Sequence, residues 1–331
     1  MKRRTLVVLA VVGAWWWRRN GDARPPVQQP VMAAVTPGGF AALVGPRDVH
    51  DSWRVVEVTR GGETEGQRAL RVDGEVRLVG TSQGPAVGWL DGGRLKLATL
   101  DEDGRPENVT TWGKRARQLC EGAASNAQRF GIGWLEADGR VWFVHGPLGR
   151  LASAPEATEV ATAGTWCGIA SAQHNVVLLW REGARLVMNF CGAKSCANVI
   201  NVPLDRGDAL LGFGCVGDSC LFAARDKRGV AKLVRVTTKG RAIARTVDDA
   251  AADTAISVVG AGSRAFAIAY VASDKRTTIR RVGVDGDFTQ VYHLEPADFA
   301  PAIAWAADKL VVVLTRYRAD WTYALDLPGG A

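Results

Sequence analysis

Two short glycine-containing motifs have residue types and spacing that could do chemistry. Residues 80–84, GTSQG, have the form of a hydrolase nucleophile elbow around Ser82, and residues 212–217, GFGCVG, have a dinucleotide-binding pattern. Both motifs act only where a helix follows directly, because the turn into that helix positions the serine or presents N–H groups to a phosphate. Here Pro85 and further strand-like residues follow the first motif, and no helical periodicity follows the second. We therefore predict a hairpin turn and an inner strand, without catalysis.

Other polar motifs also have simple structural explanations. The four histidines share no spacing that would bring two imidazoles onto one metal ion. The run DEDG at residues 101–104 is half of a calcium loop without the downstream bidentate glutamate. The tripeptide Arg206-Gly207-Asp208 resembles an adhesion signal, but a turn explains it. We expect no metal and no cofactor, although carboxylates from distant segments could still converge on one active site.

The six cysteines all lie between residues 120 and 220. Cys191 and Cys196 are separated by four residues, as are Cys215 and Cys220, which is a common hairpin length. Cysteines that face each other across a hairpin are within disulfide range. Each of these pairs is therefore predicted to form a disulfide. A four-cysteine zinc site is the alternative, but its cysteines need loops that are free to fold around the metal.

The feature that organises the chain is an internal repeat. An apolar strand closed by a polar turn recurs about every 45 residues, which is a spacing typical of propeller repeats. The seven copies of this strand are found at Phe40, Ala86, Gly131, Val176, Cys220, Ala265 and Leu310. An amphipathic strand and a weaker outer strand follow each copy, and an inner strand opens the next unit. Cys120 and Cys167 then fall on inner strands of consecutive units, which makes them plausible partners.

Seven units of four antiparallel strands resemble the β-propeller superfamily, over roughly residues 28–327. The resemblance implies an all-β fold with one seven-bladed domain over residues 24–331. It assigns no subfamily, because the signatures of the WD40, kelch, sialidase and TolB types are missing or have the wrong spacing. Large rings recur at one place in the repeat, at Trp89, Trp134, Trp180 and Tyr270, and we interpret them as filling the space between blades.

The two ends of the ring differ. The seventh unit has three strands from the C-terminal part, and residues 31–36 must supply the inner strand of the first unit. Residues upstream could add a missing outer strand, although Pro25, Pro26 and Pro30 would restrict it to an edge. Residues 1–23 join a basic start, MKRR, to an apolar run at residues 6–17, which is too short to span a bilayer but suits a signal peptide or signal anchor. Whether it is cleaved stays open.

The net charge of +7 is concentrated at the N-terminus, where residues 1–23 have five basic residues and one acidic residue. The remainder shows no basic stripe, so we expect no nucleic-acid partner. We expect a monomer that is exported to the periplasm, the cell exterior or an anchored position facing an oxidising compartment. Membrane contact would come only through an uncleaved N-terminal segment.

The turns that follow the repeated strand become basic along the chain. In a propeller these turns share one face with the loops that join consecutive blades, so this face is the predicted binding site. Its basic residues are Arg181, Lys227, Arg228, Lys275, Arg276, Arg316 and Arg318. The alternative is that these charged side chains pair with nearby acidic residues or are only hydrated, because exposed ion pairs are common and weak.

Three functions fit a propeller without a catalytic motif. The favoured hypothesis is an exported, non-catalytic propeller that binds a protein or a glycan, because this fold carries function mainly in its loops. The alternatives are a hydrolase or lyase with a site at the channel mouth, and a structural assembly module. Whether the chain is an enzyme stays undecided, with no catalytic residue assigned.

Overall fold

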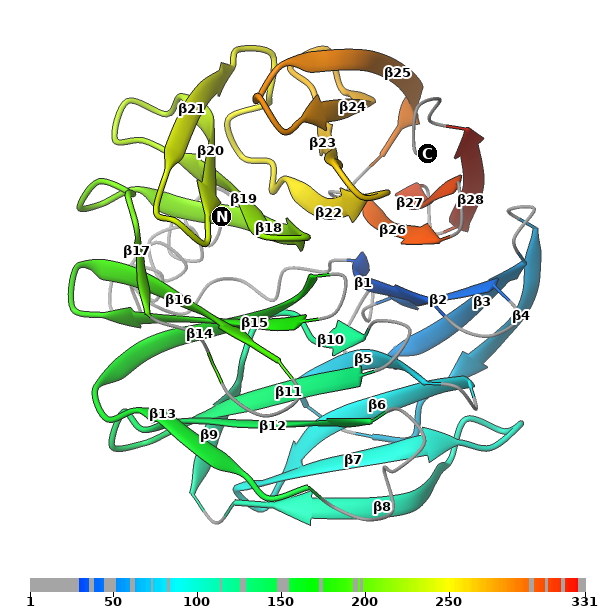
Figure 1. The fold of residues 1–331 in the computed structure, drawn as a ribbon. Helices are drawn as coiled ribbons and strands as arrows, with labels where there is room; N and C mark the ends of the chain where they lie inside the picture. Colours follow the sequence, from blue (N-terminus) through cyan, green and yellow to red (C-terminus); the bar gives the residue numbers. More distant parts are fainter. Residues whose placement is uncertain are drawn as a thin grey trace, which may run out of the picture.

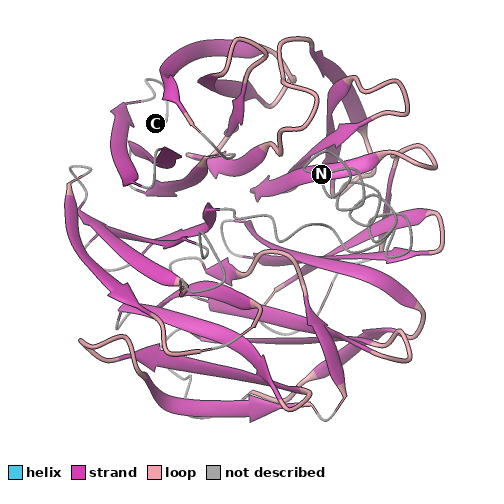
Figure 2. Cartoon of the chain, turned by 180° about the vertical axis from the view of Figure 1, so that it is seen from behind, coloured by secondary structure: helices cyan, strands magenta, loops and turns pink. Residues whose placement is uncertain are grey.

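The computed structural model describes residues 30–35, 39–44, 52–59, 63–72, 74–81, 84–113, 115–125, 129–147, 155–172, 175–192, 196, 199–297, 301–306, 309–316 and 319–326. These residues form 28 strands in seven antiparallel sheets. The sheets are arranged around a common centre (Figure 1), and the same ring is seen from behind in Figure 2, with strands and loops alone in the described part. The chain is a seven-bladed β-propeller, as the repeat predicts.

Each blade is built from the centre outwards in chain order. The inner strands are β1 (Pro30–Val35), β5 (Val76–Thr81), β9 (Ala116–Leu119) with β10 (Ala124–Ser125), β14 (Gly164–Ala172), β18 (Ala209–Val216), β22 (Ser257–Ala261) and β26 (Ala302–Ala306). The second strands are β2 (Gly39–Val44), β6 (Gly84–Asp91), β11 (Arg129–Glu136), β15 (Asn175–Glu182), β19 (Ser219–Arg225), β23 (Ala265–Val271) and β27 (Lys309–Arg316).

The third strands are β3 (Arg54–Thr59), β7 (Arg94–Leu100), β12 (Val141–Pro147), β16 (Arg185–Cys191), β20 (Ala231–Thr237), β24 (Arg276–Gly283) and β28 (Ala319–Asp326). The outer strands are β4 (Thr64–Ala69), β8 (Pro106–Trp112), β13 (Thr158–Ala161), β17 (Ile200–Val202), β21 (Ala242–Val247) and β25 (Phe288–Pro296). Blade 7 has three strands among the described residues, and β1 supplies the inner strand of blade 1, both as predicted. The inner strand of blade 3 is split into β9 and β10, which the sequence did not indicate.

The predicted signal or anchor segment, residues 1–23, lies outside the described residues, and so does the upstream stretch that could form an extra outer strand. No helix in the part of the chain that the structure describes is both long and apolar enough to cross a membrane.

The hydrophobic core lies between neighbouring blades. Trp134 of blade 3 is buried in one cluster with Leu97 of blade 2, and Tyr270 of blade 6 is buried with Leu233 of blade 5. The predicted role of the repeated rings is therefore confirmed. Because each sheet covers its apolar face with the next sheet, one blade cannot be stable alone. The ring must close for the first and last blades to be covered.

The inner strands of blades 5 and 6 approach each other at glycines. A Cβ atom added to Gly212 on β18 would lie 1.8 Å from the carbonyl oxygen of Ile256, beside β22. A Cβ atom on Gly260 of β22 would in turn lie 2.4 Å from the Cys215 carbonyl oxygen. The glycine motif at residues 212–217 thus lets two strands converge near the axis, and no helix follows it. The interpretation as an inner strand is confirmed.

All six cysteines form the predicted disulfides, and none is free. Cys191 faces Cys196, and Cys215 faces Cys220, at directly opposed positions of antiparallel pairs. The Cys120–Cys167 disulfide joins blades 3 and 4, across a sequence separation of 47 residues. A loop of that size corresponds to about 4 kcal/mol of chain entropy, against about 2 kcal/mol for each short hairpin.

Backbone hydrogen bonds reinforce the junction of blades 3 and 4. The N–H of Glu121 donates to the Cys167 carbonyl at 2.8 Å, and the N–H of Ile169 donates to the Glu121 carbonyl at 2.8 Å. This short parallel bridge continues hydrogen bonding from one sheet to the next, beside the disulfide. The two blades are therefore connected by packing, by backbone bonds and by a covalent link.

The close approach at Gly212 generates a stability prediction. Gly212→Ala forces β18 and β22 apart, because the added methyl group would overlap the Ile256 carbonyl oxygen. We expect a loss of about 1–3 kcal/mol in the free energy of unfolding, measured by urea denaturation. Gly66→Ala is the matched control, because its Cβ would meet nothing closer than 3.9 Å. This control should change the free energy of unfolding by less than about 0.5 kcal/mol. Equal effects in the two variants would show that the close approach of β18 and β22 at Gly212 is not the cause.

Candidate functional site

The turns between second and third strands and the loops that join blades lie on the same face, as predicted. The N–H of Ala116, at the start of blade 3, donates to the carbonyl of Gly93 in the blade 2 turn at 2.8 Å. In the same way the N–H of Gly164 donates to the Gly139 carbonyl at 2.6 Å. We call this surface the loop face. Backbone hydrogen bonds connect its turns to its joining loops, so the backbone positions from which the side chains extend are well defined.

Several charged groups on the loop face hold the loop between blades 5 and 6. The carboxylate of Asp249 accepts a hydrogen bond from the Tyr270 hydroxyl at 2.7 Å and another from Arg280 Nη2 at 2.8 Å. Burial, and then the bond to Asp249, raises the pKa of Tyr270 far above its ordinary value. Arg225 Nη2 donates to the carbonyls of Ala251 and Thr254. These charged side chains therefore stabilise the loop between blades 5 and 6.

The predicted binding residues fall into different environments. Lys227 and Arg228 lie on the turn of blade 5, and Lys275 lies on the turn of blade 6 with a positive φ of 69°. All three are exposed. Arg276 is also exposed, but its Nη2 is 2.7 Å from Asp274 Oδ2, an acid of its own turn. Backbone and side-chain hydrogen bonds from Arg276 lower the pKa of that carboxyl.

The other predicted residues are not brought together with these. Arg181 is half-buried near the end of β15, in blade 4, where it pairs in register with Trp166. Arg316 ends β27, but its side chain lies outside the described residues, and so does the whole of Arg318. Of the described residues, Arg181 stands alone on blade 4, Lys275 and Arg276 are adjacent at the blade 6 turn, and Lys227 and Arg228 are adjacent on the blade 5 turn.

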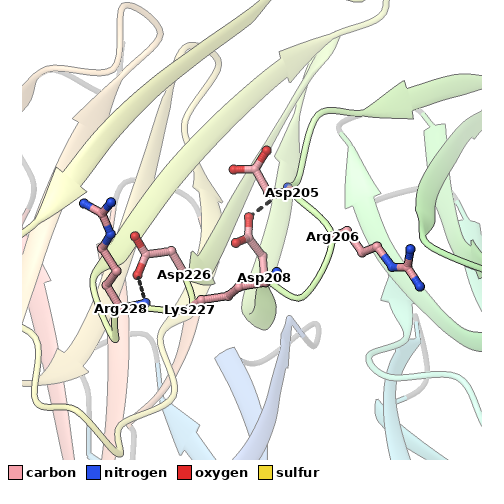
Figure 3. Close-up of a pocket in the computed structure, with 6 residues that line it drawn as sticks. All are labelled: Asp205, Arg206, Asp208, Asp226, Lys227 and Arg228. Carbon is pink, nitrogen blue, oxygen red and sulfur yellow. Dashed lines mark hydrogen bonds between the residues drawn. The ribbon is translucent and has the colours of Figure 1, made fainter.

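That pair lines a pocket of about 210 Å³ between blades 4 and 5, shown in Figure 3. The lining residues come from the joining loop and from the blade 5 turn, and they are Asp205, Arg206, Asp208, Asp226, Lys227 and Arg228. Arg206 and Arg228 point to opposite sides of this pocket (Figure 3). The pocket is open and mixed in charge, and its cations do not converge on a single point.

The acids of this pocket are used by the fold. Asp208 is 4 % exposed, and its Oδ2 atom lies 2.7 Å from Lys232 Nζ. The same oxygen accepts a hydrogen bond from the N–H of Asp205 at 2.9 Å. The hydrogen bond that Lys232 donates to Asp208 is the main reason that the pKa of Lys232 is raised. The tripeptide Arg206-Gly207-Asp208 is therefore a turn with a buried, paired acid, as the turn interpretation predicts.

Asp226 and Gly207 shape the pocket by local geometry. Asp226 Oδ1 accepts hydrogen bonds from the N–H groups of Val230 and Arg228, at 2.9 and 2.8 Å, and these bonds lower its pKa. Gly207 has a positive φ of 96°, and a Cβ atom there would lie 2.6 Å from Lys227 Cε. The aliphatic stem of Lys227 thus lies over Gly207. In this position the Lys227 ammonium group extends from the blade 5 turn towards the preceding joining loop.

A second, larger pocket of about 480 Å³ lies on the loop face at blade 3. Glu136, at the end of β11, is 6 % exposed and lies in the lining, with its Oε2 atom 3.0 Å from Arg140 Nη2. Arg140 also pairs with Asp138 at 2.9 Å and approaches Glu159 at 3.9 Å. Arg117 is exposed on the same lining. The sequence did not indicate this pocket, because its lining residues come from a turn, a joining loop and an inner strand.

The described residues contain no group of three or more histidine, cysteine, aspartate or glutamate side chains that could hold a metal ion. Gly84 of the serine motif and Pro85, which follows the motif, lie at the start of strand β6, but Ser82 itself lies outside the described residues. The described polar side chains that line the two pockets are charged and hydrogen-bonding groups of both signs.

Comparisons with known proteins identify the fold. No family model and no curated protein matches this chain. Among solved structures, it is similar to BBS1N in complex with ARL6DN, with 10 % identity and a TM-score of 0.57 over 89 % of this chain and 89 % of that one. A structure of puromycin hydrolase (S511A mutant complexed with PGG) matches with 14 % identity and a TM-score of 0.56, over 91 % and 52 % of the two chains.

A prolyl endopeptidase structure matches with 17 % identity and a TM-score of 0.53, over 92 % of this chain and 46 % of the other. This chain thus spans about half the length of both the endopeptidase and the puromycin hydrolase chains. At these identities the similarity shows the propeller fold alone, and it transfers no activity.

The buried acid of the blade 4–5 loop generates a second stability prediction. Asp208→Asn removes the charge opposite Lys232 while keeping the shape of the side chain, so we expect a loss of about 2 kcal/mol in urea denaturation. Asp205→Asn is the control, because the Asp205 side chain is 85 % exposed although it also approaches Lys232, at 3.1 Å. Its effect should stay below about 1 kcal/mol. If the control destabilises as much as Asp208→Asn, burial of Asp208 is not what matters.

Proposed function

We propose that this protein is an exported, non-catalytic β-propeller whose loop face captures a protein or glycan partner. The observation that carries the proposal is the set of exposed charged side chains on that face that the fold itself does not use. Lys227, Arg228 and Lys275 are exposed, and none of them forms an ion pair with a described residue. Side chains fixed at their base and free at their tip are available for a partner.

The cysteines support the exported location. Three disulfides with no free cysteine are compatible with an oxidising compartment, where such bonds form and persist. Cys191–Cys196 and Cys215–Cys220 close short hairpins, whereas Cys120–Cys167 joins two blades. Loss of the last bond would remove the largest share of the entropic stabilisation. Export by residues 1–23, as a cleaved signal or an uncleaved anchor, is part of the proposal.

The site is tested by reversing its charges. A variant with Lys227, Arg228, Lys275 and Arg276 changed to glutamate should retain the parental melting temperature, because these side chains are exposed. Its yield of partner in a pull-down from the native envelope should fall about tenfold, which corresponds to about 1.4 kcal/mol. Recovery of the same partners in the same yield would show that the loop face is not the binding site.

A further inference from the structure

The acidic and basic side chains of the loop face differ in how many of them have partners within the fold. Most of its acids have partners within the fold. Asp91 pairs with Lys96, Asp138 with Arg140, Asp208 with Lys232, Asp249 with Arg280 and Asp274 with Arg276, and Asp226 binds two backbone N–H groups. Five of these carboxylates are paired with cations of the fold, whereas Asp226 keeps its charge, which the nearby Arg228 and Lys232 also stabilise.

Many bases of the same face, in contrast, have no such partner. They include six that are exposed and form no ion pair with any residue in the described ranges: Arg94, Arg117, Arg206, Lys227, Arg228 and Lys275. On the acidic side, Asp248 and Asp253 are exposed without an ion pair, both in the loop between β21 and β22, and the field of Asp253 acts on Arg225. The charge left over on the described loop face is therefore positive, although the chain as a whole shows no basic stripe.

We propose that the loop face binds an acidic peptide segment of a partner protein. This inference rests on the proposed function and specifies its ligand. The six cations come from blades 2, 3, 5 and 6 and from the loop between blades 4 and 5, so they are distributed along the face. Arg206 and Arg228 point apart (Figure 3), which suits successive carboxylates of an extended chain better than one small anion.

The kind of cation supports a carboxylate ligand. Four of the six are arginines, and the planar guanidinium group can bind a carboxylate through two parallel hydrogen bonds. Lys227 adds an ammonium group at the end of a stem that lies over Gly207. Attraction between exposed charges of this kind is screened by salt, so the binding should be strongly salt-dependent.

The test uses the intact protein and a fluorescent peptide of about eight glutamates, roughly 27 Å long when extended. Anisotropy titrations should show binding that weakens as NaCl rises from about 50 to about 200 mM. The double variant Lys227→Glu, Arg228→Glu should weaken this binding about tenfold. The matched control is Lys239→Glu, Arg241→Glu, which makes the same charge change on the opposite turn of the same blade, where both residues are exposed. It should leave the affinity within about twofold.

Three results would overturn the acidic-peptide inference: no binding of the peptide, equal weakening by both double variants, or tighter binding of a heparin oligosaccharide or single-stranded DNA of similar length. The outcome is separable from that of the proposed function. If the double variant loses its native partner while wild type ignores the glutamate peptide, the loop face binds a ligand of another chemistry. If partner capture is unchanged in the variant, the loop-face assignment itself fails.

Discussion

Packing between neighbouring blades is the interaction on which the rest of this structure depends. Each sheet has apolar side chains that only the neighbouring sheet can cover. For example, Trp134 of blade 3 packs against blade 2, and Tyr270 of blade 6 packs against blade 5. The same requirement holds at the junction of the chain's two ends, where Val56 and Val58 of blade 1 pack with Ala304 and Val311 of blade 7. Closure of the ring therefore determines the stability of every blade, because no sheet has a core of its own.

The geometry of the ring also explains where glycines and covalent links occur. Near the axis the inner strands come so close that a side chain would collide with the neighbouring backbone, as at Gly212 and Gly260. At blades 3 and 4 the same proximity allows backbone hydrogen bonds and the Cys120–Cys167 disulfide. A motif that resembles nucleotide-binding chemistry in the sequence is thus a consequence of packing at the centre of a propeller.

The sequence predicts the repeated part of the structure well and the loops poorly. A period of about 45 residues, with alternating apolar strands, determines the number of blades and the order of strands, and cysteines at opposed hairpin positions determine their partners. The split of the inner strand at β9 and β10 depends on contacts with blade 4, which no local pattern encodes. The same is true of part of the site: buried Asp208 pairs with Lys232 on β20, and the stem of Lys227 lies over Gly207 of the preceding loop, so both contacts join separate segments. The pair of Glu136 and Arg140, in contrast, lies within one turn.

The central claim, that a closed ring stabilises every blade, is tested most directly at β1, which lies beside β26 (Figure 1) and supplies the inner strand of blade 1. The measurement is thermal unfolding of a chain from which Pro30–Val35 has been deleted, compared with a chain that lacks only residues 1–23. The account predicts that deletion of β1 abolishes soluble, cooperative unfolding, because it leaves backbone groups of β2 unpaired and uncovers blade 7. Cooperative melting near the parental temperature without β1 would contradict it.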